Sequence, residues 1–183
     1  MKKISLIAVL TLIVVLVASC GGKAATSSYA DALEVINTVW SNVAEADKYP
    51  VGGGDSANLN MEGPAKFDHT NKEELDVTLA LPTALADKVE DAASMMHMMN
   101  ANMMTAGAYR LVEGTDATAF ANDYKANLAD RRWMCGSPEK YIVIGSGNYV
   151  VTAFGSAQNI DSFKAAAEKL ENATVLVEGD IEV

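Results

Sequence analysis

The chain has 183 residues, of which 50% are hydrophobic and 21% are charged, with 14 basic and 24 acidic side chains. A chain this apolar can bury enough surface to offset the entropy lost on folding, so extended disorder is excluded. Two cysteines exclude a disulfide-rich scaffold, and a net charge of -10 argues against nucleic acid as a partner, because phosphate binding needs a basic patch. The composition therefore indicates an acidic globular protein.

The first 19 residues have the pattern of an export signal. Lys2 and Lys3 provide a positive start, and an apolar stretch follows from Ile4 to Val17. As a helix this stretch would span about 21 Å, which is short of the ~30 Å hydrocarbon core of a bilayer. We therefore expect residues 1–19 to be a cleaved signal peptide and not a membrane-spanning anchor.

The four residues Val17-Ala18-Ser19-Cys20 resemble a bacterial lipobox. The resemblance implies that Cys20 becomes the first residue of the mature chain, carrying diacylglycerol on its thiol and a fatty acid such as palmitate on its amine. Two or three acyl chains hold a protein on a membrane almost permanently. We therefore expect a lipid-anchored protein on the extracytoplasmic face of the cell membrane, with residues 20–27 as a short tether and residues 28–183 as a single domain.

The first part of this domain shows one helix and one long irregular segment. Apolar residues at three- and four-residue steps predict a helix that begins near Ser28 and ends near Asp47. Val51–Lys72 is rich in glycine and lacks periodicity, so we expect a long loop of the kind that often carries function. Leu75–Leu81 has the pattern of a short strand that ends at Pro82.

A second helix is predicted after Pro82, because apolar residues step by three or four to form one stripe: Leu85, Val89, Ala92, Met96, Met99 and Met103. The remaining patterns predict, in order, a strand over Thr105–Val112, a helix from about Asp116, a hairpin of Tyr141–Ile144 and Tyr149–Phe154, a helix through Ile160 to Leu170, and a strand at Thr174–Val177.

From Thr105 onward the expected order is strand, helix, strand, strand, helix, strand, which is the βαββαβ order of ferredoxin-like folds. We therefore expect an α+β fold in which an antiparallel sheet carries its helices packed on one face. Two N-terminal helices would precede this unit.

The segment 95–104 holds six of the nine methionines. Thioethers are soft ligands, so an exported protein could hold Cu(I) here, with one set best suited: Met95, His97, Met98 and Met99. Core packing explains the methionines of the helical stripe without a metal, so no metal or cofactor is predicted. Met95 and Met98 fall on a flank of the same helix, which predicts an exposed apolar surface for a protein partner or a small ligand.

A second unusual string surrounds Cys135, which would be the only free thiol once Cys20 is lipidated. Directly after Trp133 and Met134 we expect Cys135 to be a small buried hydrophobe, with a reactive or intermolecular thiol as the alternative. Trp133 joins Met95 and Met98 as a candidate for the partner surface.

The sequence contains only two histidines and no hydrolase or phosphate-loop motif, so no catalytic residue is assigned and no enzyme is predicted. The first hypothesis is a membrane-tethered binding or accessory module, which binds through the Met-rich helix together with the Gly-rich loop (Val51–Pro64). The alternative is an extracytoplasmic copper-binding protein.

The chain resembles small bacterial lipoproteins that are built from a single domain of unknown function. The resemblance rests on the lipobox and on three further stretches: Ala92–Asn102, Arg132–Glu139 and Gly147–Gly155. It implies an extracytoplasmic lipoprotein without a known activity or cofactor, and it transfers no functional residue.

Overall fold

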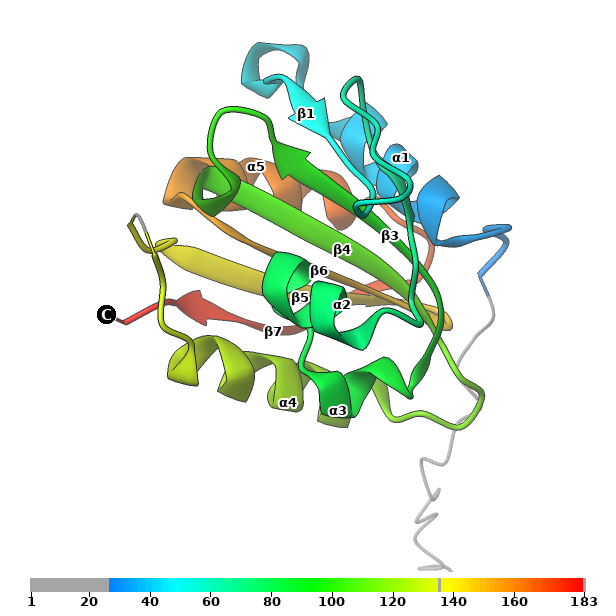
Figure 1. Ribbon diagram of the computed structural model, residues 1–183. Coiled ribbons are helices and arrows are strands. Elements are labelled where there is room, and N and C mark those ends of the chain that lie inside the picture. Colours follow the sequence, from blue (N-terminus) through cyan, green and yellow to red (C-terminus); the bar gives the residue numbers. More distant parts are fainter. Residues whose placement is uncertain (1–26, 135, 183) are drawn as a thin grey trace, which may run out of the picture.

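The computed structural model describes residues 27–134 and 136–182. In this part of the chain, an antiparallel seven-stranded sheet lies between two layers of helices (Figure 1). The elements in chain order are α1 (Ala32–Asn42), the 3-10 helix η1 (Glu45–Asp47), β1 (Val51–Gly52), β2 (Ala65–Phe67), α2 (Lys72–Leu79), α3 (Thr83–Ala86), β3 (Val89–His97), the 3-10 helix η2 (Ala101–Met103), β4 (Met104–Leu111), α4 (Ala117–Asp130), β5 (Lys140–Ser146), β6 (Tyr149–Gly155), α5 (Ala157–Ala167) and β7 (Ala173–Asp180). The expected α+β class and antiparallel sheet are therefore confirmed, whereas the predicted signal peptide and Cys20 lie outside the described residues.

The strands lie side by side in the order β1-β3-β4-β6-β5-β7. Strand β2 pairs with the same edge of β3 as β1 does, a few residues earlier along β3. Strands β4 and β6 pair from Met104 opposite Gly155 to Arg110 opposite Tyr149. The end of the sheet that carries Met104 is therefore opposite to the end that carries the β5–β6 turn.

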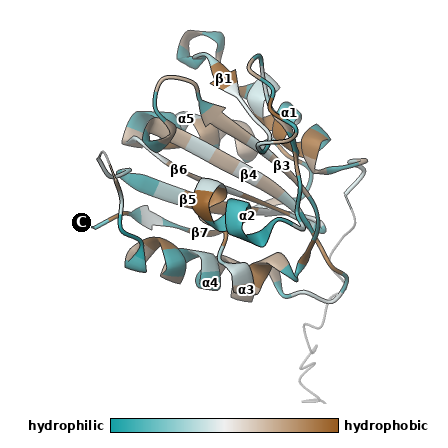
Figure 2. Ribbon diagram, viewed as in Figure 1, coloured by the Kyte–Doolittle hydropathy of each residue, from teal (hydrophilic) through white to brown (hydrophobic). Residues whose placement is uncertain are grey.

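Side chains alternate between the two faces of the sheet, so each strand contributes to two cores. On β4, Ala106 and Ala108 pack in the core under α1 and α5. Tyr109 and Leu111 pack in the other core, under α2, α3 and α4. Figure 2 shows hydrophobic residues gathered along the strands and hydrophilic residues over much of α2 and α4.

The expectation that the helices pack on one face is wrong. The order β4, α4, β5, β6, α5, β7 follows the expected order of element types along the chain, but α4 and α5 cover opposite faces of the sheet (Figure 1). The physical reason is that both faces of β5 and β6 are apolar: every residue from Tyr141 to Gly155 that lies in these strands is buried. A ferredoxin-like arrangement with one bare face would expose half of that surface to water.

The predicted helix from Leu85 to Met103 is also wrong, because the central part of this segment, Val89–His97, is strand β3. It pairs with β4 from Val89 opposite Leu111 to Met96 opposite Thr105, and with β1 and β2 on its other side. Alanine and methionine favour helices, but pairing on both sides outweighs such a weak local preference. Between residue 27, where the described chain begins, and β4 there are therefore three α-helices and three strands, instead of two helices.

The segment expected to form a strand at Leu75–Leu81 forms most of α2. The Asn71 side chain caps this helix by accepting a hydrogen bond from the backbone N–H of Glu74, at 3.2 Å. Ala80 ends it in a left-handed conformation with φ of 53°. Leu75 and Leu79 are four residues apart, as a helix requires, and both are buried in the second core.

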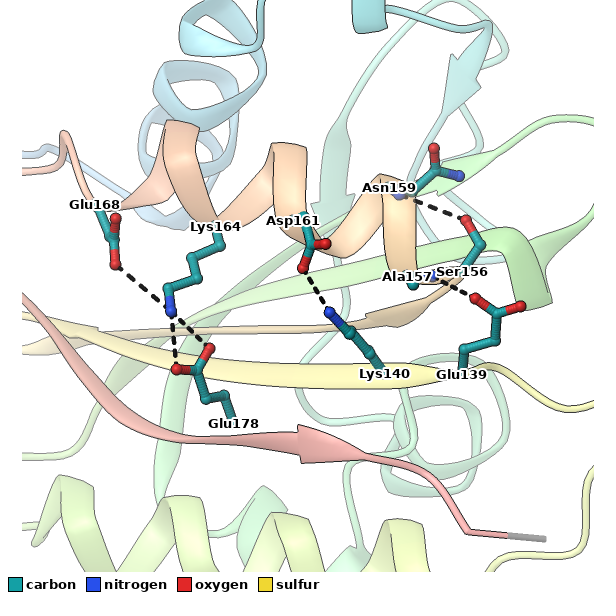
Figure 3. A network of polar contacts seen from close by, with 9 residues as sticks. All are labelled: Glu139, Lys140, Ser156, Ala157, Asn159, Asp161, Lys164, Glu168 and Glu178. Atoms are coloured by element: carbon teal, nitrogen blue, oxygen red, sulfur yellow. Dashed lines mark hydrogen bonds and ion pairs between the residues drawn. The ribbon is translucent and has the colours of Figure 1, made fainter.

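Helix α5 is fixed to the sheet by charged groups (Figure 3). Lys140 pairs with Asp161 at 2.9 Å, and Lys164 pairs with Glu178 at 2.8 Å. These hydrogen bonds raise the pKa of both lysines. Glu139 accepts a hydrogen bond from the backbone N–H of Ala157 at 2.7 Å, where the partial positive charge at the start of the helix favours an anion. These groups satisfy one another, so this cluster holds the fold together and is not a candidate site.

Candidate functional site

A pocket of about 250 Å³ opens where the Gly-rich loop meets the end of β3, beside β1. Both segments line it: Gly52, Gly53, Leu59 and Met61 from the loop, and Met96, His97, Met98, Met99, Asn100 and Ala101 from the end of β3 and the turn after it. No acidic, lysine or arginine side chain is among these residues. We call this feature the methionine pocket, because four of its lining residues are methionines.

The Gly-rich loop is held against β3 by hydrogen bonds and by close backbone packing. Gly53 and Asn60 exchange hydrogen bonds at 2.8 and 2.9 Å, which close the loop on itself. The hydroxyl of Ser94 is fully buried, accepts a hydrogen bond from the N–H of Gly54 at 2.8 Å and donates one to its carbonyl at 3.3 Å. A Cβ at Gly53 would lie 2.3 Å from the carbonyl oxygen of Ser94, so only glycine allows this close approach.

Asp55 organises the far side of the same loop. Its carboxylate accepts hydrogen bonds from the backbone N–H groups of Ala57, Asn58 and Asp68 and from the Asn58 side chain. Burial by itself would raise the pKa of Asp55, but these hydrogen bonds to the charged form outweigh burial and hold the pKa below its ordinary value of 3.8. The loop wall of the pocket is therefore fixed before any ligand binds.

The methionine side of the pocket is fixed by the turn that follows β3. The N–H of Met98 donates to the carbonyl of Pro50 at 3.0 Å, and the N–H of Met99 donates to Nδ1 of His97 at 3.0 Å. The His97 ring stacks on Tyr49, with 4.6 Å between ring centroids and 22° between planes. Burial raises the pKa of the Tyr49 phenol, which keeps this aromatic support neutral.

Sulfur and apolar groups dominate the interior and the rim of the pocket. The Met98 sulfur lies against Gly52, where an added Cβ would be only 2.6 Å away. Three apolar side chains at the rim are largely exposed: Leu59 is 63%, Met61 57% and Met99 82% accessible. Exposed apolar groups gathered around a cavity are typical of binding sites.

Met95 does not belong to this surface, in contrast to the prediction. It is fully buried in the core with α1 and α5. In a strand, neighbouring side chains point to opposite faces, so Met95 is separated from Met96. Of the predicted partner-surface residues, only Met98 lines the pocket.

Trp133, the third residue predicted for the partner surface, does not line the methionine pocket. Its ring packs on Phe154 at 5.1 Å between centroids and is half-buried at the edge of the second core. The Asn102 side chain ties the segment after Trp133 to the β3–β4 turn by donating hydrogen bonds to the carbonyls of Met134 and Gly136, at 3.0 and 2.7 Å. Met134 is exposed, and Cys135 lies outside the described residues.

The predicted copper ligands Met95, His97, Met98 and Met99 are not brought together as a set. Met95 is in the core, and the His97 ring is occupied by Tyr49 and by the N–H of Met99. Among residues 27–134 and 136–182, no three His, Cys, Asp or Glu side chains are grouped to hold a metal ion. The pocket instead adds Met61, which the sequence did not single out because it is 35 positions from Met96 and no spacing rule connects them.

The fold and the pocket define a class of protein: an α+β domain with an antiparallel sheet covered on both faces and an apolar, sulfur-lined pocket at one end. Comparison with protein-family models, curated proteins and solved structures finds no match for this chain. Within the described part of the chain, the helices are too short or too polar to cross a bilayer.

Proposed function

We propose that this protein is a non-enzymatic binding module, anchored by lipid at Cys20 to the extracytoplasmic face of the cell membrane, and that it binds its ligand in the methionine pocket. The observation that carries the proposal is the meeting of two distant segments around one apolar cavity. Hydrogen bonds to Ser94 and Asp55 fix the loop wall of the pocket, and a hydrogen bond to His97 fixes the methionine wall. A preformed site loses little entropy when a ligand binds.

The position of Ser27, at which the proposed tether meets the domain, supports this proposal. The Ser27 hydroxyl donates to the Asn148 side chain at 3.4 Å, in the β5–β6 turn, and the Ser28 hydroxyl donates to Glu171 at 2.6 Å. This turn lies at the end of the sheet opposite to Met104 and the methionine pocket. A domain held at Ser27 therefore presents the pocket away from the membrane, where a ligand in the extracytoplasmic space can reach it.

We propose binding rather than catalysis because His97 is the single titratable side chain among the described residues that line the pocket. Its Nδ1 already accepts a hydrogen bond from Met99, and no second acid or base lines the cavity. General acid–base catalysis needs a group that is free to exchange a proton with the substrate.

The proposal is tested with protein whose methionine methyl groups carry ¹³C, mixed with envelope extract from the native cells. An envelope ligand of any chemistry should shift the NMR signals of Met61, Met98 and Met99. The double variant Leu59→Asp/Met99→Asp places charges at the rim and should abolish the remaining shifts.

Val77→Asp is the matched control, because Val77 is equally exposed, at 70%, but lies on α2. This variant should keep the response. An extract that leaves the signals of Met61 and Met98 unmoved, or that moves them equally in the rim variant, would refute the proposed site.

A further inference from the structure

We infer that the methionine pocket binds a soft monovalent cation, Cu(I) or its analogue Ag(I), through the thioethers of Met61, Met96, Met98 and Met99. This inference rests on the proposed function and names its ligand. Four of the nine methionines of the chain line this one pocket of about 250 Å³. They come from two segments that the fold brings together, so their meeting is a property of the tertiary structure.

The residues that line the pocket favour a soft metal ion over a hard one. Carboxylates and carbonyls suit Mg²⁺ and Ca²⁺, thiolates and imidazoles suit Zn²⁺, and thioethers suit Cu(I). The pocket offers uncharged sulfur ligands and no carboxylate. An uncharged ligand set neutralises none of the charge on a divalent ion, so it favours a monovalent one. The net charge of -10 adds a long-range attraction for cations in general.

Met98 is the best-placed of the four ligands. Its sulfur lies over Gly52, where the absence of a side chain leaves room for it at the pocket wall. Met96 lies near the end of β3, two residues before Met98, and lines the same pocket. Met61 and Met99 are more exposed, at 57% and 82%, so they can close over an ion that has entered.

His97 has a positioning role in this site. Its Nδ1 accepts the hydrogen bond from the N–H of Met99, and its ring face is covered by Tyr49. With Nδ1 as an acceptor, the neutral ring carries its proton on Nε2, which leaves neither nitrogen with a free lone pair for a metal. His97 therefore fixes the backbone conformation of the turn that carries Met98 and Met99. All the proposed ligands are sulfur atoms.

The test is a titration of the mature lipoprotein, purified in detergent with lipid on the Cys20 thiol, with silver nitrate in chloride-free buffer. All samples carry Cys135→Ser, which removes that thiol. We expect one equivalent of Ag(I) to shift the ¹³C-methyl signals of Met61, Met96, Met98 and Met99. The signals of Met95 and Met104, which are fully buried in the core, serve as internal controls and should not move.

Variants separate ligands from positioning groups. The triple variant Met61→Leu/Met98→Leu/Met99→Leu keeps the apolar volume and should bind Ag(I) at least about 100-fold more weakly. His97→Gln should weaken binding by about 10-fold, the usual effect of losing a group that only positions ligands. Met103→Leu/Met134→Leu changes two exposed methionines outside the pocket and should leave the affinity unchanged. Circular dichroism and the melting temperature verify that each variant is folded.

The inference is overturned if Ag(I) leaves the four pocket signals in place, or if the triple variant binds as tightly as the parent. If envelope extract moves the pocket signals and silver does not, the binding module stands and the metal assignment fails. If neither moves them, both fail.

Discussion

Met95 and Met98 carry the same side chain three positions apart, yet the structure gives them opposite environments. Met95 is fully buried between the sheet and the layer of α1 and α5, and Met98 lies at the wall of the methionine pocket. On a helix, positions three apart share a side, but Met95 lies within β3 and Met98 follows the end of that strand. The effect of a polar substitution should therefore differ between these two residues.

We expect Met95→Gln to lower the free energy of unfolding by about 2–4 kcal/mol, because it buries an amide without a partner and removes packing in the core. Met98→Gln should change it by less than about 1 kcal/mol, since the amide can reach solvent at the pocket. Urea denaturation of both variants measures the difference. Equal destabilisation of the two would contradict the strand assignment of this segment.

At the scale of elements, the Gly-rich loop behaves as one unit built around Asp55. The carboxylate accepts hydrogen bonds from Ala57 within the loop and from Asp68 directly after β2, and its exposure is only 4%. Because its pKa is lower in the folded protein than in the unfolded chain, ionised Asp55 stabilises the fold at any pH above its ordinary value of 3.8. This contribution is lost as the pH falls below 3.8 and through the folded pKa.

The loop should therefore stay ordered from neutral pH down to about pH 4 and loosen below it. Asp55→Ala should lower the free energy of unfolding at pH 7 by about 1–3 kcal/mol, because it leaves several donors unpaired, and should flatten the acid dependence. Asp68→Ala, an exposed change directly after β2, should cost less than about 1 kcal/mol. Urea denaturation and the Met61 methyl signal, both followed between pH 7 and pH 3, measure these effects, and an unchanged acid dependence in Asp55→Ala would speak against this role.

At the scale of the whole molecule, Ser27 and the pocket lie at opposite ends of the sheet. The described chain begins beside Asn148, and the pocket lies past the other end of β4. Strand β4 has eight residues and spans about 26 Å at roughly 3.3 Å per residue. A lipid anchor at Cys20 should therefore hold the β5–β6 turn near the bilayer and the pocket away from it.

This orientation can be measured with a fluorophore on a single introduced cysteine, Asn148→Cys or Met99→Cys, in the Cys135→Ser background. In liposomes with nitroxide-labelled headgroups, we expect strong quenching at position 148 and weak quenching at position 99, because quenching falls steeply with distance. Cys20→Ala should abolish quenching at both positions. Stronger quenching at position 99 than at position 148 would reverse the proposed orientation.

Several elements could be predicted from the sequence because their signals are local. The hairpin of β5 and β6 follows from two apolar runs around Gly145-Ser146-Gly147-Asn148, and α4 follows from Asp116, whose side chain accepts hydrogen bonds from two backbone N–H groups. The lipobox at Cys20 is likewise a local pattern, and the anchor that it predicts is independent of the fold. The unbroken apolar runs of the hairpin also indicate burial on both faces, which a ferredoxin-like arrangement with one uncovered face does not provide.

Only the tertiary structure decided the nature of β3, the distribution of the helices and the composition of the pocket. Alanine and methionine in β3 are compatible with a helix, and the partners that make it a strand are Ala65–Phe67 on one side and Met104–Leu111 on the other. Met61 and Met96 line the same pocket because the loop packs against β3, where Gly53 contacts Ser94. This contact exists only after the sheet has formed. Contacts between segments so far apart depend on the pairing of whole strands, and no periodicity in a single segment records them.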